Sequence, residues 1–257
     1  MRDQVVEDAT FAVVDVETTG IDHQEDAVVE VACVVMRNGR EVRSFSSLVD
    51  PLRAIPPTAA AVHHLTGEML QGEPPLTALA PILTQLCEGA VVVAHNAAFD
   101  LNFLPMLAHR PALCTLRLAR HCFPELPGHA NQVLRYALSA NVGLVPGVPH
   151  RALADAHVTA AVLQILLARY RELGRSNRVD DLVAFADAPI TFARLPFGQH
   201  RRKPLAEVPA TYLRWIVERA NPPFDRDVRH TASSELARRV RIAAPSGFAT
   251  AAAQAQA

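Results

Sequence analysis

The sequence predicts an α/β domain with a mixed sheet, followed by a small C-terminal module of different composition. Strand-like segments joined by hairpin signals come first, and helical and strand-like segments then alternate up to about residue 173. That order is typical of a sheet flanked by helices. After residue 190 the chain becomes richer in Pro, aromatic and Arg residues, which indicates a second unit.

Four strands are predicted from β-branched runs and turn residues. Residues 11–17 form the first apolar run, and Val28–Met36 the second. Asn38-Gly39 predicts a hairpin that leads into a third strand over Arg40–Asp50. The fourth strand is predicted over Ala90–His95, because this run is short and apolar.

Prolines, caps and helical spacing of apolar residues predict the helices. Asn96 is expected to cap the helix that follows the fourth strand. The longest predicted helix covers Arg151–Tyr170. The other predicted helices begin at Thr58, after Pro74-Pro75, and at the segments CTLRLARHCF and NQVLRYALSA.

We expect four parts along the chain. Residues 1–173 form the α/β domain, 174–190 a polar, irregular linker, 191–240 a small basic module, and 241–257 a low-complexity, disordered tail. From residue 191 onward, eleven basic minus five acidic residues give +6, so the total of −1 leaves −7 for the preceding part. A basic module tethered to an acidic one is common in nucleic-acid enzymes, although surface charge often has no such meaning.

Cysteine usage and hydropathy exclude several classes of protein. The four cysteines form no C-x-x-C pair, which argues against a zinc site and a disulfide framework. The N-terminus carries acids and no signal-type apolar block. We therefore expect a cytoplasmic protein with no membrane partner, and the sequence predicts no particular oligomeric state.

Two carboxylates end the first strand, in the segment FAVVDVETTG. Asp15 and Glu17 are two residues apart, so their side chains point to the same side of the strand. Such a like-charged pair is unfavourable unless a cation lies between its members. Two solvated acids at a strand end are the alternative, since short D-x-E matches are frequent by chance.

Two further acids come from distant segments. Asp100 lies about one turn into the helix after the fourth strand, and Asp155 lies in the first turns of the long helix. A doubly wound sheet gathers such positions at one edge. Hard oxygen ligands suit Mg²⁺ or Mn²⁺, and two such ions about 3.5–4 Å apart assist phosphodiester hydrolysis. His150 is the candidate general base, because imidazole titrates near neutral pH.

The segments DVETTG, AHNAAFD and HRALADA resemble the three motifs of the DEDDh 3′→5′ exonucleases, in order and spacing, over roughly residues 10–170. The resemblance implies a ribonuclease-H-like exonuclease domain, with a mixed five-stranded sheet flanked by helices. It also implies that Asp15, Glu17 and Asp155 bind metal and that Asp100 supports the second ion. In the same way it implies that His150 is the general base.

Within that family, the chain is most similar to the exodeoxyribonuclease X group. The segment LVDPLRAIPPTAAAVHHLTGEML and the C-terminal LPFGQHRRKPLAEVPATYLRWI carry this likeness. Arg202 stands where the small C-terminal module of that group usually has glycine. Tyr212 and Trp215 are expected in the core of the module.

The resemblance also suggests positions that contact nucleic acid. It implies that Thr18 and Thr19 bind the terminal hydroxyl through backbone groups, with simple turn formation as the alternative. Leu65 is expected against the terminal base, with helix-end packing as the alternative. Asn96 is a further candidate, although a capping role is favoured for it.

Aromatic and basic side chains are weaker candidates for nucleic-acid contacts. Phe99 and Phe103 are four apart on a helix and suit base stacking, but core packing is favoured. Arg201, Arg202 and Lys203 suit phosphate contacts, with a solvated face as the alternative.

Together these features predict a metal-dependent 3′→5′ exodeoxyribonuclease that uses two Mg²⁺ or Mn²⁺ ions and releases 5′-mononucleotides from DNA, single-stranded or at 3′ ends. A role in DNA repair follows from the resemblance alone. The alternatives are an exonuclease of the polymerase III proofreading type, an RNA-trimming exonuclease, and a non-catalytic nucleic-acid-binding adaptor.

Overall fold

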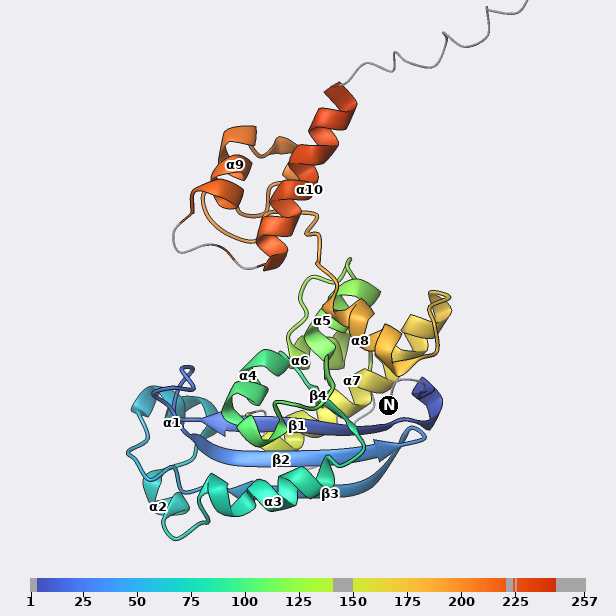
Figure 1. Ribbon diagram of the computed structural model, residues 1–257. Coiled ribbons are helices and arrows are strands. Elements are labelled where there is room, and N and C mark those ends of the chain that lie inside the picture. Colours follow the sequence, from blue (N-terminus) through green and yellow to red (C-terminus); the bar gives the residue numbers. More distant parts are fainter. Residues whose placement is uncertain (1–3, 141–149, 221–223, 225, 244–257) are drawn as a thin grey trace, which may run out of the picture. The chain divides into compact units, whose positions relative to one another are not determined.

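The computed structural model describes residues 4–140, 150–220, 224 and 226–243. The chain divides into two compact units between Ala188 and Pro189. Figure 1 labels most of the helices and strands, and each unit has hydrophobic clusters of its own.

The first unit is built on a mixed sheet of five strands in the order β3-β2-β1-β4-β5. β1 pairs antiparallel with β2 and parallel with β4, and β4 pairs parallel with β5. This confirms the expected mixed five-stranded sheet. The strands are β1 (Thr10–Thr18), β2 (Val28–Arg37), β3 (Arg40–Leu48), β4 (Val91–Ala94) and β5 (Ala112–Cys114). The sequence patterns did not reveal β5, which is only three residues long.

Side chains of β1 alternate between two separate hydrophobic cores, one on each face of the sheet. Phe11 and Val13 belong to one core, and Ala12, Val14 and Val16 belong to the other. The central strands are therefore buried on both faces, as expected for a sheet covered by helices on each side. Asp15 and Glu17 continue the row of Phe11 and Val13, so strand periodicity places them on that face.

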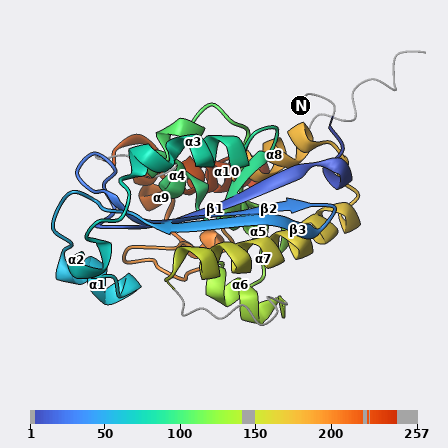
Figure 2. The ribbon, with the colours of Figure 1, turned by 90° about the horizontal axis from the view of Figure 1, so that it is seen from below.

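Helices cover both faces of the sheet. Figure 2 shows α3 and α4 above the strands and α7 below them, and both α3 and α7 contact β2. The helices of this unit are α1 (Pro57–His63), α2 (Gly67–Leu70), α3 (Leu76–Leu86), α4 (Ala97–Phe103), α5 (Thr115–Cys122), α6 (Asn131–Ala137), α7 (Ala152–Glu172) and α8 (Val179–Asp187), with 3₁₀ turns η1 (Val6–Asp8) and η2 (Pro105–Leu107).

Helix α7 is the core helix of the unit. Among the described residues it is the one helix long and apolar enough to span a membrane, by length and composition only. Ten of its side chains are buried, and it packs against β1 and β2. Its apolar character is therefore accounted for by contact with the sheet.

Two local expectations are wrong. Asn96 precedes α4 at the cap position, but its backbone is left-handed (φ +71°) and its side chain makes no capping hydrogen bond. The expected irregular linker over 174–190 contains α8, because Val179 and Leu182 are apolar and buried in the first core. A sequence that is polar overall can still form a helix when a few apolar positions reach a core.

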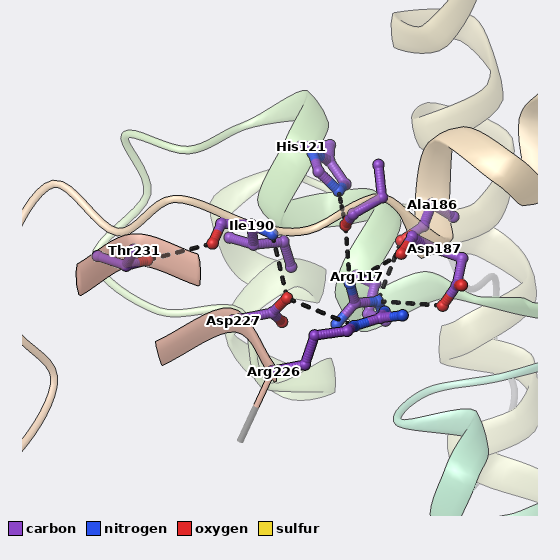
Figure 3. Close-up of polar contacts among 9 residues, drawn as sticks. Arg117, His121, Ala186, Asp187, Ile190, Arg226, Asp227 and Thr231 are labelled. Atoms are coloured by element: carbon purple, nitrogen blue, oxygen red, sulfur yellow. Dashed lines mark hydrogen bonds and ion pairs between the residues drawn. The ribbon is translucent and has the colours of Figure 1, made fainter. Parts of the chain in front are cut away.

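The end of α8 is fixed by side chains of α5. Arg117 Nε donates to the carbonyl of Ala186 (3.1 Å), and its Nη2 donates to the carbonyl of Ala188 (2.8 Å), as Figure 3 shows. His121 Nε2 lies 3.0 Å from the same Ala188 oxygen. These contacts satisfy carbonyls that a helix end leaves without intrahelical partners.

The second unit has its own small core around η3 (Leu205–Glu207), α9 (Ala210–Glu218) and α10 (Arg226–Ala243). Asp227 accepts the backbone N–H of Ile190 (3.1 Å), and the Thr231 hydroxyl donates to the carbonyl of Ile190 (3.2 Å), as Figure 3 shows.

Trp215, expected in this core, is 40% exposed. The expected disordered tail begins inside a helix, because α10 continues to Ala243, and residues 244–257 lie outside the described residues. A separate function for the C-terminal module stays a prediction.

Candidate active site

The first two acids of the site lie at the carboxyl end of β1. Asp15 and Glu17 are both partly buried on the face of the sheet that α7 covers. The β1–β2 register shifts directly after Glu17, between Glu17 and Thr18. Such irregularities end strand pairing and re-aim side chains next to active sites.

Asp155 reaches this strand end from the first turn of α7. Its Oδ2 accepts the backbone N–H of His150 (2.8 Å), and its Oδ1 accepts a hydrogen bond from Gln132 Nε2 (2.7 Å). Glu17, His150 and Asp155 each offer one ligand atom, and these atoms lie within 4.8 Å of one another. The structure therefore brings together three of the five catalytic residues that the sequence predicts.

Asp100, on α4, is almost fully buried, with 3% of its surface exposed. Its Oδ1 accepts the backbone N–H of Val16 (3.2 Å), the residue between the two β1 acids. β4 ends at Ala94 and pairs with β1 only up to Val13, so Asp100 satisfies a strand N–H that β4 does not reach. This hydrogen bond ties the fourth acid to the same strand end.

Three of the four acids, Asp15, Glu17 and Asp100, lie in an environment that disfavours their charged forms. Burial, followed by repulsion from Asp100 and Asp155, raises the pKa of Asp15 well above its usual range. Burial and Asp155 raise the pKa of Glu17 to about 8, and burial raises that of Asp100 to about 7. Clustered carboxylates of this kind need a bound cation to ionise together.

The donor set fits divalent metal ions. All four acids supply oxygen atoms, the ligands that Mg²⁺ and Mn²⁺ prefer. The arrangement is also typical of functional sites, where pKa values are perturbed by burial and by like charges. A carboxylate cluster able to hold divalent cations is thus present at the carboxyl end of β1.

Glu30 and Arg151 were missed in the sequence and lie next to the site. Glu30 is opposite Glu17 in the β1–β2 register and is only 4% exposed. Its carboxylate accepts hydrogen bonds from Arg151 Nε (3.0 Å) and Nη2 (2.8 Å), and from the backbone N–H of Ala152 (3.0 Å). The available signal was an acid within the apolar run VVEVACVVM, since a buried carboxylate requires a partner.

His63 lies in the same neighbourhood. Its Nδ1 accepts the backbone N–H of Leu65 (3.0 Å), and its buried Nε2 has no hydrogen-bond partner within the described residues. Burial lowers its pKa, while Glu30 and a backbone contact with Thr18 oppose that shift.

The two threonines expected to bind nucleic acid, Thr18 and Thr19, already make hydrogen bonds within the first unit. The Thr19 N–H donates to the carbonyl of Ala27 (2.8 Å), and the Thr19 hydroxyl donates to Asp26 (3.0 Å). The Thr18 hydroxyl donates to the carbonyl of Gly20. In this structure Thr19 therefore has the turn-forming role, and its N–H is not available to a terminal hydroxyl.

The other three predicted contact residues differ in exposure. Leu65 is fully buried in a cluster with Val29 and Leu70, so the packing alternative describes it in this structure. Asn96 is exposed. Phe99 is half-buried, with its ring 5.1 Å from that of Phe103. Asn96 and Phe99 remain predicted contacts.

Known proteins resemble this chain over the part that carries the site. The exonuclease family RNase_T matches residues 12–163, more than half of the chain. The 3′-5′ exonuclease DinG of Bacillus subtilis is 34% identical over 172 residues, which are 63% of this chain and 18% of that protein. The DNA polymerase III subunit epsilon of Treponema pallidum is 32% identical over 175 residues, 65% of this chain and 80% of that protein.

A solved structure of exonuclease X in complex with 5′ overhanging duplex DNA is 32% identical, with a TM-score of 0.58. The match covers 68% of this chain and 99% of that chain. Escherichia coli exonuclease I in complex with a dA16 oligonucleotide is similar in fold, at 15% identity and a TM-score of 0.58, over 85% of this chain and 61% of that chain. The chain spans less than a fifth of the length of the DinG and PolC-type relatives that it matches.

Proposed function

Because this chain belongs to the DEDDh family of 3′→5′ exonucleases, we propose that its substrate is DNA and that it releases 5′-mononucleotides from 3′ ends. The observation that carries the hydrolytic activity is the convergence of Glu17, His150 and Asp155 within 4.8 Å. Asp15 and Asp100 complete the site at the same strand end.

Asp15, Glu17 and Asp155 are the proposed metal ligands, and Asp100 supports the second of two Mg²⁺ or Mn²⁺ ions. When bound, such ions make water a stronger nucleophile and stabilise charge on the leaving oxygen. The raised pKa values of Asp15 and Glu17 support this assignment, because a bound cation offsets the burial and the repulsion that raise them.

His150 is proposed as the general base. Its side chain is exposed, and one of its ring nitrogens lies within 4.8 Å of the Glu17 and Asp155 carboxylates. The Asp155 carboxylate accepts the His150 backbone N–H, which fixes the start of the catalytic segment. His150 takes one proton from water as the oxygen attacks phosphorus. The bond to the 3′ oxygen of the preceding nucleotide breaks, and that oxygen leaves as a hydroxyl after taking a proton from solvent water.

DNA is favoured as substrate because the exonuclease X relative was solved with duplex DNA that has a 5′ overhang, a substrate that presents a 3′ end. A role in repair and a cytoplasmic location belong to this proposal. Proofreading for a polymerase is the second candidate function, favoured by the 32% identity to the epsilon subunit.

The test is digestion of a 5′-labelled single-stranded DNA oligonucleotide with Mg²⁺, beside EDTA and Asp155→Ala controls. We expect a ladder that shortens from the 3′ end and is absent in both controls. A substrate that stays intact while the protein still binds it would favour the adaptor alternative. Cleavage of RNA alone would favour the RNA-trimming alternative.

A further inference from the structure

The second unit carries a positive charge that its own acids do not neutralise. From residue 191 onward the chain has eleven basic and five acidic residues. Two of the acids are used inside the unit: Glu235 is bound by both Arg238 and Arg239, and Asp227 accepts the Ile190 N–H. The excess charge is therefore carried by basic side chains on the surface of the unit.

Three of these basic side chains lie together on a tight hairpin. The Leu195 N–H donates to the carbonyl of Lys203 (3.0 Å), and the Arg202 N–H donates to the carbonyl of Leu195 (2.8 Å). Arg201, Arg202 and Lys203 are all exposed. Within the described part of the chain, their side chains form no ion pair or hydrogen bond.

The hairpin is joined to α9 by aromatic contacts. The His200 ring packs edge-on against Tyr212, with centroids 4.7 Å apart, and Tyr212 lies 5.3 Å from Trp215. Gly198 leaves no room for a side chain, because a Cβ there would lie 2.4 Å from the Tyr212 hydroxyl. These ring contacts connect the basic hairpin to Trp215 through Tyr212.

Trp215 combines ring packing with solvent exposure. Its indole contacts the Phe224 ring, with centroids 5.5 Å apart, and Phe224 stacks on Phe197 at 4.3 Å. Nevertheless, 40% of Trp215 is exposed. Arg219, the residue directly after α9, is exposed as well, and its backbone N–H donates to the carbonyl of Trp215 (3.0 Å), four positions earlier.

We propose that this surface, formed by Arg201, Arg202, Lys203, Trp215 and Arg219 and termed the hairpin surface, binds a strand of DNA as a second site of the enzyme. The basic side chains contact backbone phosphates, and Trp215 stacks on a base. Exposed aromatic rings beside a positive groove or patch are the usual means of holding a single strand without sequence preference. The choice of DNA as ligand rests on the proposed function, but the binding itself requires no cleavage.

The single tryptophan of the chain reports on this surface directly. We would titrate the full-length protein with single-stranded DNA in EDTA, following Trp215 emission and, in parallel, the anisotropy of a labelled oligonucleotide. We expect quenching of the tryptophan at the DNA concentrations that raise the anisotropy. Binding without any change in emission at any salt concentration would overturn the contact with Trp215.

The test variant is Arg201→Gln/Arg202→Gln/Lys203→Gln. Each lost phosphate contact lowers the slope of log K against log salt by about 0.7 for a single strand, so the slope falls by about 2 and affinity at low salt falls about tenfold or more. The control variant Arg40→Gln/Arg43→Gln/Arg241→Gln removes the same charge from exposed residues elsewhere and should leave affinity near that of the parent. Equal affinity and slope for the test variant and the parent would overturn the proposal.

Measurements of kcat and KM distinguish DNA binding by the hairpin surface from the proposed exonuclease activity. With Mg²⁺ and saturating DNA, the test variant should keep the kcat of the parent, and its KM should rise about tenfold, in line with the lost affinity. If the parent cuts nothing but its tryptophan is still quenched, the proposed activity fails and the hairpin surface stands. If kcat falls while KM stays constant, the hairpin contributes to the chemistry and the second-site proposal fails.

Discussion

Glu30 and Arg151 form an ion pair that joins β2 to the start of α7 across 121 positions of sequence. Two hydrogen bonds hold the guanidinium to the carboxylate, and the same carboxylate accepts the first N–H of the helix, at Ala152. In the sequence, Arg151 lies between His150 and the first residue of α7, the helix that carries Asp155. The pair therefore fixes the position of the third motif against β2, at the point where Glu30 lies opposite Glu17 of the first motif.

Removing this pair should lower activity without removing a catalytic group. We expect Glu30→Gln to lower kcat about tenfold, which corresponds to about 1.4 kcal/mol, with little effect on DNA affinity in EDTA. The control is Glu41→Gln, which changes another side-chain contact with α7. In this contact Glu41 lies 3.0 Å from His157, and its side chain is 39% exposed. Unchanged kcat in Glu30→Gln would show that the helix start is held by other contacts.

The two partners should differ in their effect on stability. The Glu30 side chain is 6% exposed, whereas that of Arg151 is 40% exposed. Arg151→Met leaves a buried carboxylate with one backbone donor and should lower the free energy of unfolding by about 3 kcal/mol, near the range for broken buried pairs. Glu30→Gln leaves an exposed guanidinium and should cost only about 1 kcal/mol. Urea denaturation without metal measures both, and equal losses would contradict the asymmetry.

His150→Gln should reduce kcat by about 10²–10⁴-fold, the range for losing a general base. The backbone N–H that Asp155 accepts is retained in this variant. DNA binding in EDTA should therefore match that of the parent. A kcat equal to that of the parent across the pH range would remove His150 from the mechanism.

The metal-free protein should become less stable as the pH rises toward 8. In the folded state the pKa of Asp100 is raised to about 7 and that of Glu17 to about 8, mainly by burial. The folded state thus binds more protons than the unfolded state above about pH 4, and stability falls by up to about 1.4 kcal/mol per pH unit for each retained proton.

Burial also lowers the pKa of His95 to about 4, which acts in the opposite direction below about pH 6.5. The clear window is therefore pH 6.5–8. Mg²⁺ should raise Tm more at pH 8 than at pH 6.5, because it binds the ionised carboxylates. Thermal unfolding of the parent and of Asp15→Asn checks this, and the Mg²⁺-dependent shift should be smaller in the variant.

Arg202→Gly should stabilise the second unit. Arg202 has a left-handed backbone (φ +67°), a conformation that costs about 1 kcal/mol for a residue with a Cβ. Glycine removes that cost but has a larger unfolded-state entropy, so we expect a net gain of about 0.5 kcal/mol. Arg201→Gly, at an ordinary backbone conformation, is the matched control and should not stabilise. A loss of stability in Arg202→Gly would mean that contacts of the Arg202 side chain stabilise the unit by more than its left-handed backbone destabilises it.

Short-range sequence patterns were enough for most of the first unit. Alternation and β-branching gave the first four strands, and the period of two placed Asp15 and Glu17 on one face. The three motifs led to the acids and the histidine that the structure brings near one strand end. Sequence patterns failed for β5 and α8, whose formation depends on a few apolar contacts with the rest of the unit. β5 is three residues long, and α8 packs on the core through residues such as Val179 and Leu182.

The sequence by itself determined the strand that ends in two carboxylates, the order of the three motifs and the positive charge of the C-terminal part, since all of these are local or additive properties. Only the tertiary structure decided that Glu30 is bound by Arg151, that Asp100 satisfies the N–H of Val16, and that Leu65 is buried. The physical reason is distance along the chain. A buried carboxylate must find a donor, but which donor it finds depends on how strands and helices pack, and that information is spread over the whole domain.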